Sequence, residues 1–213
     1  MLCMACNSAC TQNPKNESAT LSLKPVGGRC EDCEAVLEYK NLNKVLNWID
    51  TLPNFNERGP KLEVSGTIYK HDGKTPAKDV ILYVYHTDQI GEYSVRGDEK
   101  DWGKRHGYIR GWIKTSADGK YKFYTLRPGA YPMGGNPAHI HPIIREGDGH
   151  VYWIDEYLFD DDPILSDSER KDQPGRGGFG ILKTKRGKNG ILVAERNIIL
   201  GLNIPGYDKL INN

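Results

Sequence analysis

A hydrophobic period of two begins near residue 60 and constrains the fold more than any other feature. Residues 62–69 alternate along strand-forming side chains and are followed by a turn at Asp72-Gly73. Asp118-Gly119, between two more such runs, predicts a β-hairpin. Other short strand candidates, bounded by turn residues, lie at 80–86, 111–115, 120–125, 138–145, 151–159 and 191–200. This pattern predicts an all-β fold, either an antiparallel sandwich or a barrel.

The length and composition fit one β-rich domain with appendages. The 213 residues include 24 glycines and 12 prolines, which favour turns, and a 38% hydrophobic share that is low for a helical bundle. We divide the chain into a polar tail (1–24), a lead-in (25–59) and a β-domain (60–213). The charged, glycine-rich stretch 165–189 is expected to form a long surface loop.

The lead-in contains a helical pattern over 41–52. Its apolar residues share one helical face and precede Pro53, so we expect a short N-terminal helix that covers a sheet edge. These residues are Leu42, Val45, Leu46, Ile49 and Leu52.

The charge balance excludes some classes of partner. The net charge is +1, from 29 basic and 28 acidic residues, so composition gives no support for nucleic-acid binding. No apolar run approaches the ~20 residues of a membrane span.

The cysteines are confined to the first sixth of the chain, at Cys3, Cys6, Cys10, Cys30 and Cys33. The run Met4-Ala5-Cys6-Asn7-Ser8 resembles the end of a bacterial lipoprotein signal, although the apolar region that should precede it is missing. We therefore expect an exported protein, periplasmic or anchored by a lipid at Cys6, with a cytoplasmic location as the alternative.

Cys30 and Cys33 form a C-x-x-C pair with three interpretations. We expect a local disulfide, which suits an oxidising compartment. A zinc site that joins them to Cys3 and Cys6 has suitable ligands but loose spacing. A thioredoxin-like redox site needs a βαβ unit, and the sequence predicts none.

The run P-A-H-I-H at 137–141 carries the sharpest chemical signal. Residues i and i+2 of a strand face the same way, so His139 and His141 can converge on one metal ion. An isolated H-x-H more often marks two partly exposed histidines, so the motif gains weight only from its neighbours.

Those neighbours form an ordered series of motifs. They are G-T-I and D-G-K-x-P within 66–76, H-x-D-x-x-G-x-Y ending at Tyr93, I-R-G-W at 109–112 and L-R-P-G-A-Y-P at 126–132. With P-A-H-I-H, this series resembles the intradiol ring-cleavage dioxygenases over about residues 64–200. The resemblance implies a prealbumin-like β-sandwich, and family members often pair, which would make a homodimer.

The resemblance implies a non-haem iron(III) held by Tyr93, Tyr131, His139 and His141. Phenolate oxygens suit a hard, highly charged cation. The expected substrates are a catechol-type ring and O2, and cleavage between the hydroxylated carbons would give a muconate-type diacid. Tyr131 matches the tyrosine that leaves the metal and accepts a substrate proton.

Two positions depart from the family pattern. Asn136 stands where an arginine usually precedes P-A-H, and Glu156 stands where a gap-free count places a glutamine. Both changes affect the electrostatic stabilisation of the reacting substrate, so they bear on rate and substrate. Arg110, Arg127 or Arg145 could replace the lost charge, although each is better explained as a solvated surface residue.

Other residues receive structural interpretations. We expect His86 to be structural and the acidic run 160–162 to be solvated, and we assign Trp112, Trp153 and Tyr157 to the core or a pocket wall. Prealbumin-like accessory sandwiches share the D-G-K and L-R-P-G-A-Y strings but have no reason to keep all four metal ligands. The alternatives to an enzyme are such a binding module and an iron-binding relative that has lost turnover.

Overall fold

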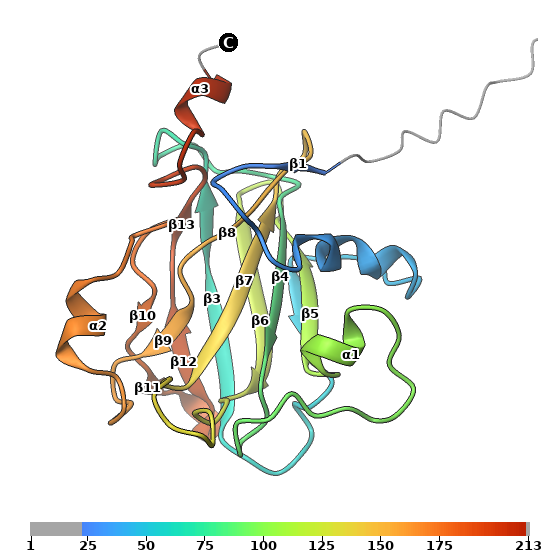
Figure 1. Ribbon diagram of the computed structural model, residues 1–213, viewed down its shortest axis with the longest axis vertical. Helices are drawn as coiled ribbons and strands as arrows, with labels where there is room; N and C mark the ends of the chain where they lie inside the picture. Colours follow the sequence, from blue (N-terminus) through green and yellow to red (C-terminus); the bar gives the residue numbers. More distant parts are fainter. Residues whose placement is uncertain (1–22, 212–213) are drawn as a thin grey trace, which may run out of the picture.

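In the computed structural model, which describes residues 23–211, two β-sheets pack face to face (Figure 1). The predicted tail, with the candidate anchor at Cys6, lies almost wholly outside the described residues. Within residues 23–211 there is no helix of sufficient length and apolarity to cross a membrane.

The first sheet has the order β1-β8-β7-β4-β5, and β9 and β10 extend it beside β7. Its strands are β1 (Lys24–Pro25), β4 (Ile81–His86), β5 (Arg110–Lys114), β7 (His139–Arg145), β8 (His150–Trp153), β9 (Tyr157–Phe159) and β10 (Ile181–Leu182). The second sheet has the order β11-β12-β3-β6-β2, with β13 also paired to β3. Its strands are β2 (Ile49–Thr51), β3 (Lys61–Tyr69), β6 (Lys120–Leu126), β11 (Lys185–Arg186), β12 (Leu192–Glu195) and β13 (Ile198–Ile199).

The central ladders of both sheets are antiparallel, as predicted. Strand β4 pairs antiparallel with β5 and β7, and β3 pairs antiparallel with β6. The edges differ, because β1, β2, β10, β12 and β13 pair parallel with their neighbours. The β-sandwich prediction is confirmed, with mixed sheets in place of purely antiparallel ones.

The helices are short and lie outside the sandwich (Figure 1). They are η1 (Cys33–Lys40), α1 (Gly103–His106), α2 (Asp167–Lys171), η2 (Lys188–Gly190) and α3 (Asp208–Ile211). Helix α2 lies on the opposite side of the sandwich from η1 and α1.

The main core fills the space between the sheets. Alternate residues of β3, such as Leu62 and Val64, face Leu82 and Val84 of β4, and all four side chains are fully buried. Burial of one such side chain contributes about 1.5–3 kcal/mol, so the sandwich depends on the alternation read from the sequence.

A second apolar cluster covers the outer face of the first sheet. Ala35 and Val36 of η1 pack there against Tyr83, Trp112 and Ile143. The structure joins Cys30 and Cys33 in a disulfide at the start of η1, which confirms the expected pairing. Neither sulfur is then available as a zinc thiolate.

The prediction of a helix over 41–52 was wrong. The structure places η1 earlier, with Asn41 as its C-cap, and Asn43 just beyond it adopts a left-handed conformation (φ 50°). Ile49–Thr51 instead forms β2, which pairs with β6 at the edge of the second sheet. An isolated helix of this length is marginal, so strand pairing decides the outcome and leaves Val45 92% exposed.

The prediction of a β-hairpin at Asp118-Gly119 was also wrong. The flanking strands β5 and β6 belong to different sheets, because β5 pairs with β4 and β6 pairs with β3. The turn itself forms, and the Gly119 N–H donates to the Ser116 carbonyl. Turn chemistry therefore predicted a reversal of direction but not the partner of each strand.

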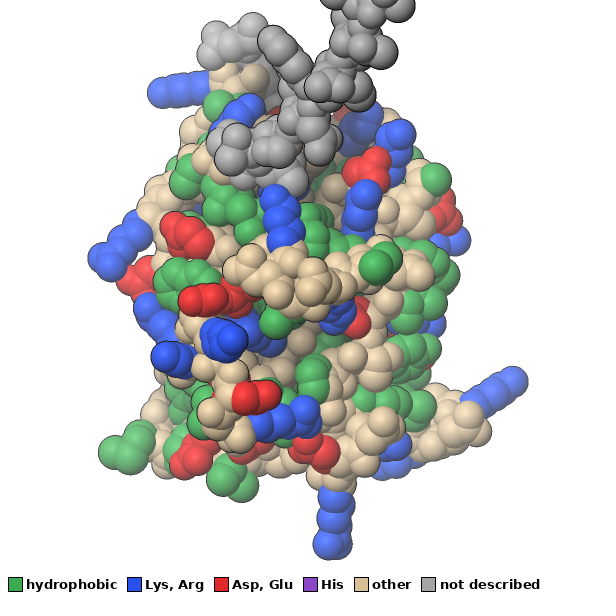
Figure 2. Space-filling view, turned by 90° about the vertical axis from the view of Figure 1, so that its right-hand side faces the viewer, with side chains coloured by type: hydrophobic (Ala, Val, Ile, Leu, Met, Phe, Trp, Pro, Cys, Tyr) green, Lys and Arg blue, Asp and Glu red, His purple; other side chains and the backbone are tan. Residues whose placement is uncertain are grey.

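The stretch 165–189, predicted as a surface loop, contains α2, β10 and β11. Ser166 begins α2 with a capping box that it shares with Glu169. On the face that carries η1 and α1, basic and acidic side chains are interspersed (Figure 2). This mixture agrees with the near-zero net charge.

Candidate metal centre

The two histidines of the H-x-H motif lie on one face of β7. Their Nε2 atoms are 3.0 Å apart. Strand β7 is hydrogen-bonded to β4 on one side and to β8 and β9 on the other, so the imidazoles project from the rigid interior of a sheet. His139 is buried, whereas His141 is half-buried.

Two tyrosines reach the same point from separate loops. Tyr93 lies between β4 and α1, and Tyr131 follows β6. The Oη atoms of the tyrosines are 2.7 Å apart, and the Tyr93 Oη is 2.8 Å from the His141 Nε2. The structure thus brings together all four side chains that the sequence predicted as metal ligands.

Two glycines hold the tyrosine loops against each other. Gly91 has a φ of +84°, and a Cβ there would overlap the Ala130 carbonyl oxygen. A Cβ at Gly129 would overlap the Gln89 carbonyl in the same way. The Gly129 N–H donates to the Asp88 carbonyl at 2.8 Å, so the close approach of the loops places Tyr93 near Tyr131.

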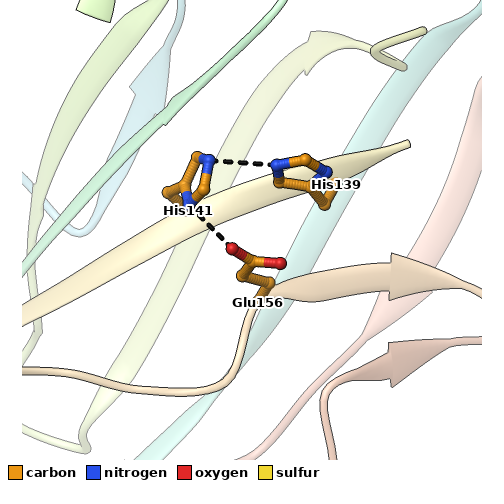
Figure 3. A group of neighbouring side chains, drawn as sticks. All are labelled: His139, His141 and Glu156. Carbon is orange, nitrogen blue, oxygen red and sulfur yellow. Dashed lines mark hydrogen bonds and ion pairs between the residues drawn. The ribbon is translucent and has the colours of Figure 1, made fainter. Parts of the chain in front are cut away.

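The second ring nitrogen of each histidine, Nδ1, has a hydrogen-bond acceptor. The Nδ1 of His139 donates to the Pro137 carbonyl (2.7 Å), and the Nδ1 of His141 donates to Glu156 Oε1 (3.0 Å) (Figure 3). With both protons on Nδ1, both Nε2 atoms present lone pairs toward each other and the tyrosines. A cation between them would relieve this repulsion.

The electrostatics also fit a cation. Burial raises the pKa of Tyr93, and its hydrogen bond with Tyr131 raises it further. Burial likewise raises the pKa of Tyr131 and lowers that of His139. A bound metal reverses this trend for phenols because it stabilises phenolate directly. Two phenol oxygens and two imidazole nitrogens form a donor set that suits iron.

A cavity of about 670 Å³ opens beside these atoms, and Tyr93, Tyr131 and His141 line it. The Tyr85 ring, also in its wall, stacks on His141 (centroids 4.6 Å apart) and on His106 (3.8 Å). This volume is within the range of small-molecule sites.

The two positions that depart from the family pattern, Glu156 and Asn136, differ in their distance from the cavity: only Glu156 lines it. Burial is the largest single influence on Glu156 and acts to raise its pKa, but the hydrogen bond from His141 and the charge interactions with His141 and His139 together outweigh burial and leave the pKa below its usual value. Asn136 is exposed and is not among the residues that line this cavity.

The arginines named from sequence do not line the cavity. Arg110 is buried and pairs with Glu38, and Arg127 pairs with Asp161. Arg145 is 3% exposed, and its Nε and Nη2 have no hydrogen-bond partner among the described residues. The solvated-surface interpretation is therefore wrong for Arg110 and Arg145.

Two other arginines line the cavity, and sequence reasoning missed them. Arg105 of α1 pairs with Asp32 at 2.9 Å, and Arg29 pairs with Glu31 at 3.1 Å. Arg29 directly precedes the C-x-x-C pair at 30–33, which does not indicate proximity to the histidines, and no motif marked Arg105.

The acidic run has structural partners. Asp160 and Asp161 pair with arginines, whereas the buried Asp162 accepts the Ala138 N–H at 2.7 Å and so braces the start of β7. Trp112 and Tyr157 are core residues and Trp153 lines the cavity, as expected.

His86 is structural, as predicted. Its Nδ1 is 2.6 Å from the Thr87 carbonyl oxygen, and its Nε2 is 2.7 Å from Thr125 Oγ1. Burial lowers its pKa from 6.5 to about 4. Between pH 6.5 and about 4, His86 binds a proton in the unfolded chain but not in the folded chain, so a lower pH favours unfolding.

We therefore expect metal-free protein to lose stability as the pH falls from about 6.5 toward 4, with His86 contributing up to about 3 kcal/mol. Urea unfolding near neutrality and near pH 5 should show a flatter dependence in His86→Gln. Some dependence should remain, because burial also lowers the pKa of His106 to about 4. An unchanged slope in the variant would contradict the assignment.

Comparisons with known proteins agree with this geometry. A family model described as dioxygenase matches residues 39–172. The protocatechuate 3,4-dioxygenase beta chain of Burkholderia cepacia is 27% identical over 123 residues, which cover 55% of this chain and 52% of that protein. Catechol 1,2-dioxygenase 1 of Acinetobacter lwoffii is 33% identical over 131 residues, which cover 58% of this chain and 37% of that protein.

Among solved structures, the dioxygenase domain of a dioxygenase–carbohydrate-binding fusion from Streptomyces sp. SirexAA-E superimposes with a TM-score of 0.55 at 22% identity. The match covers 70% of this chain and 85% of that one. The chain spans about half or less of the length of the two curated relatives.

Proposed function

The chain belongs to the intradiol ring-cleavage dioxygenase family, and from this premise we propose that it binds iron(III) and cleaves a catechol-type ring between its hydroxylated carbons with O2. The observation that carries the proposal is the convergence of four donor atoms beside a cavity. These are the Oη of Tyr93 and Tyr131 and the Nε2 of His139 and His141. The product would be a muconate-type diacid.

Each residue has a role that follows from its contacts. Bound iron(III) would supply Lewis-acid activation of a chelating catechol. His139 and His141 are fixed by the sheet and by their Nδ1 partners, so they would remain bound. The Tyr93 Oη contacts both His141 and Tyr131, whereas among residues 23–211 the Tyr131 Oη is hydrogen-bonded only to Tyr93. Tyr131 is therefore the freer phenol and would accept the substrate proton at its Oη.

The cavity supports a substituted catechol. Its volume exceeds what one aromatic ring needs, and Trp153, Ile154 and Leu158 offer apolar wall. Positive charge comes from Arg29 and Arg105 at the wall rather than from the position of Asn136. Each arginine is already paired with a carboxylate of the same wall, Glu31 for Arg29 and Asp32 for Arg105, so neither would fully replace the charge of the missing family arginine.

The proposal predicts that iron-loaded protein is coloured by phenolate-to-iron charge transfer and consumes oxygen with catechol. Iron content, the visible spectrum and oxygen uptake across a catechol panel would test it. Colourless protein without stoichiometric iron would refute the metal site. Coloured protein that turns over no catechol would favour the iron-binding relative that has lost activity.

The disulfide supports the export inferred from the tail. Such bonds persist in oxidising compartments, and Cys30–Cys33 is formed in the structure. We propose a periplasmic or lipid-anchored location on this ground.

A further inference from the structure

We infer that Glu156 is a positioning residue that fixes the orientation and tautomer of His141 and strengthens its donation to the metal. The inference rests on the proposed function, because it concerns the same iron site. It gives a chain-specific role to a carboxylate at the position where the family pattern has a glutamine.

The fold places Glu156 beside the Nδ1 of His141, on the side of the ring away from the tyrosines. Glu156 directly precedes β9, whose Tyr157 pairs with Ile140 of β7, so the two strands hold the carboxylate beside the imidazole. The Glu156 Oε1 lies 3.0 Å from the His141 Nδ1 (Figure 3). On the other ring nitrogen, the His141 Nε2 is 2.8 Å from the Tyr93 Oη.

The orientation of the His141 ring is fixed by two contacts. Tyr85 stacks on it with an interplanar angle of 17° and prevents tilting. Stacking alone permits a 180° flip of the ring about its Cβ–Cγ bond, which would put ring carbons where the two nitrogens now lie. The hydrogen bond to Glu156 selects the orientation in which Nε2 points toward the tyrosines.

A carboxylate does more here than an amide could. An ionised carboxylate only accepts hydrogen bonds, so it requires the proton on Nδ1 and leaves Nε2 as a lone-pair donor. A glutamine amide can donate as well as accept and would permit either tautomer. The negative charge also strengthens the donation from the imidazole to a bound metal ion and favours ferric over ferrous iron.

Direct ligation by Glu156 is the competing interpretation. The ligand atoms of His139, His141 and Glu156 lie within 4.8 Å of one another, a grouping that could itself hold a metal ion. However, Glu156 contacts the Nδ1 of His141, whereas the tyrosines and His139 lie on the side of its Nε2. A metal at the Nε2 side would have the imidazole between itself and this carboxylate.

Glu156→Gln is therefore expected to retain iron but to bind ferric iron roughly 10- to 100-fold more weakly, with the affinity for ferrous iron little changed. At 59 mV per tenfold for one electron, the reduction potential would rise by about 60–120 mV. The phenolate-to-iron band should move to longer wavelength, because the iron becomes a better electron acceptor.

The experiment measures iron content, visible spectrum and reduction potential for wild type, Glu156→Gln and Glu156→Asp. Asp148→Asn serves as a matched control, because it removes a carboxylate that contacts a histidine Nδ1 at 2.8 Å but does not line the cavity. The control should leave potential and spectrum unchanged. Glu156→Asp should recover part of the wild-type potential if its shorter side chain still reaches Nδ1.

Several outcomes would overturn the inference. Loss of iron from Glu156→Gln would identify Glu156 as a ligand, and an unchanged potential and band would show that the contact has no effect on the metal. Because these readouts need no turnover, wild-type protein that binds iron but cleaves no catechol would refute the proposed reaction and still test Glu156. Wild-type protein without iron would refute both.

Discussion

Tyr131→Phe is expected to suppress ring cleavage by roughly 10²- to 10⁴-fold, the usual contribution of a positioned proton acceptor. The variant loses the Oη that would take the substrate proton, while Tyr93, His139 and His141 keep their mutual contacts. It should still bind iron, with an altered colour because one phenolate donor is gone. Oxygen uptake with catechol and the visible spectrum would measure both effects.

Tyr124→Phe is the matched control. Tyr124 lies on β6, where its ring packs against Phe55, and it does not line the cavity. This variant should retain both rate and colour. If Tyr131→Phe also retained full activity, or if both variants lost activity equally, the role assigned to Tyr131 would be untenable.

Gly91→Ala is expected to lower the free energy of unfolding by about 3 kcal/mol or more. A left-handed conformation costs a residue with a Cβ about 1–2 kcal/mol, and the overlap with Ala130 adds a packing penalty. For a chain of this length the melting midpoint should fall by roughly 6–12 °C. Because the two loops must separate, Tyr93 and Tyr131 should also move apart and iron affinity should drop.

Gly97→Ala separates backbone strain from overlap. Gly97 lies in the same connection between β4 and α1, has a φ of +98°, and a Cβ there would meet no atom within 4 Å. Gly97→Ala should lower the free energy of unfolding only by the cost of the left-handed conformation, and it should leave iron binding intact. Thermal unfolding and iron titration of both variants would provide the comparison. Equal effects would mean that the contact between the loops does not hold the tyrosines.

Sequence predicted those parts of the site that depend on local periodicity. The period of two placed His139 and His141 on one face of a strand, and β7 bears this out. Their meeting with Tyr93 and Tyr131 depends on contacts between loops, which the ordered motifs indicated but residue spacing did not. Arg29 and Arg105 were missed because they reach the cavity through the disulfide-linked segment and α1.

The errors in the fold have a common physical origin. The stripe at 41–52 and the turn at Asp118-Gly119 are local signals, whereas their outcomes were decided by long-range pairing of β2 with β6 and of β5 with β4. Local propensity is worth less than the hydrogen bonds of a completed sheet edge.

The four donor atoms come from three separate stretches of chain, and Tyr93 and His141 are 48 residues apart. An ion that binds all of them would act as a cross-link and restrict the unfolded chain by closing long loops. Since the ion would bind the folded chain in preference to the unfolded chain, its affinity would add directly to folding stability. Resistance to unfolding would then report how much of the protein carries metal, independently of any substrate.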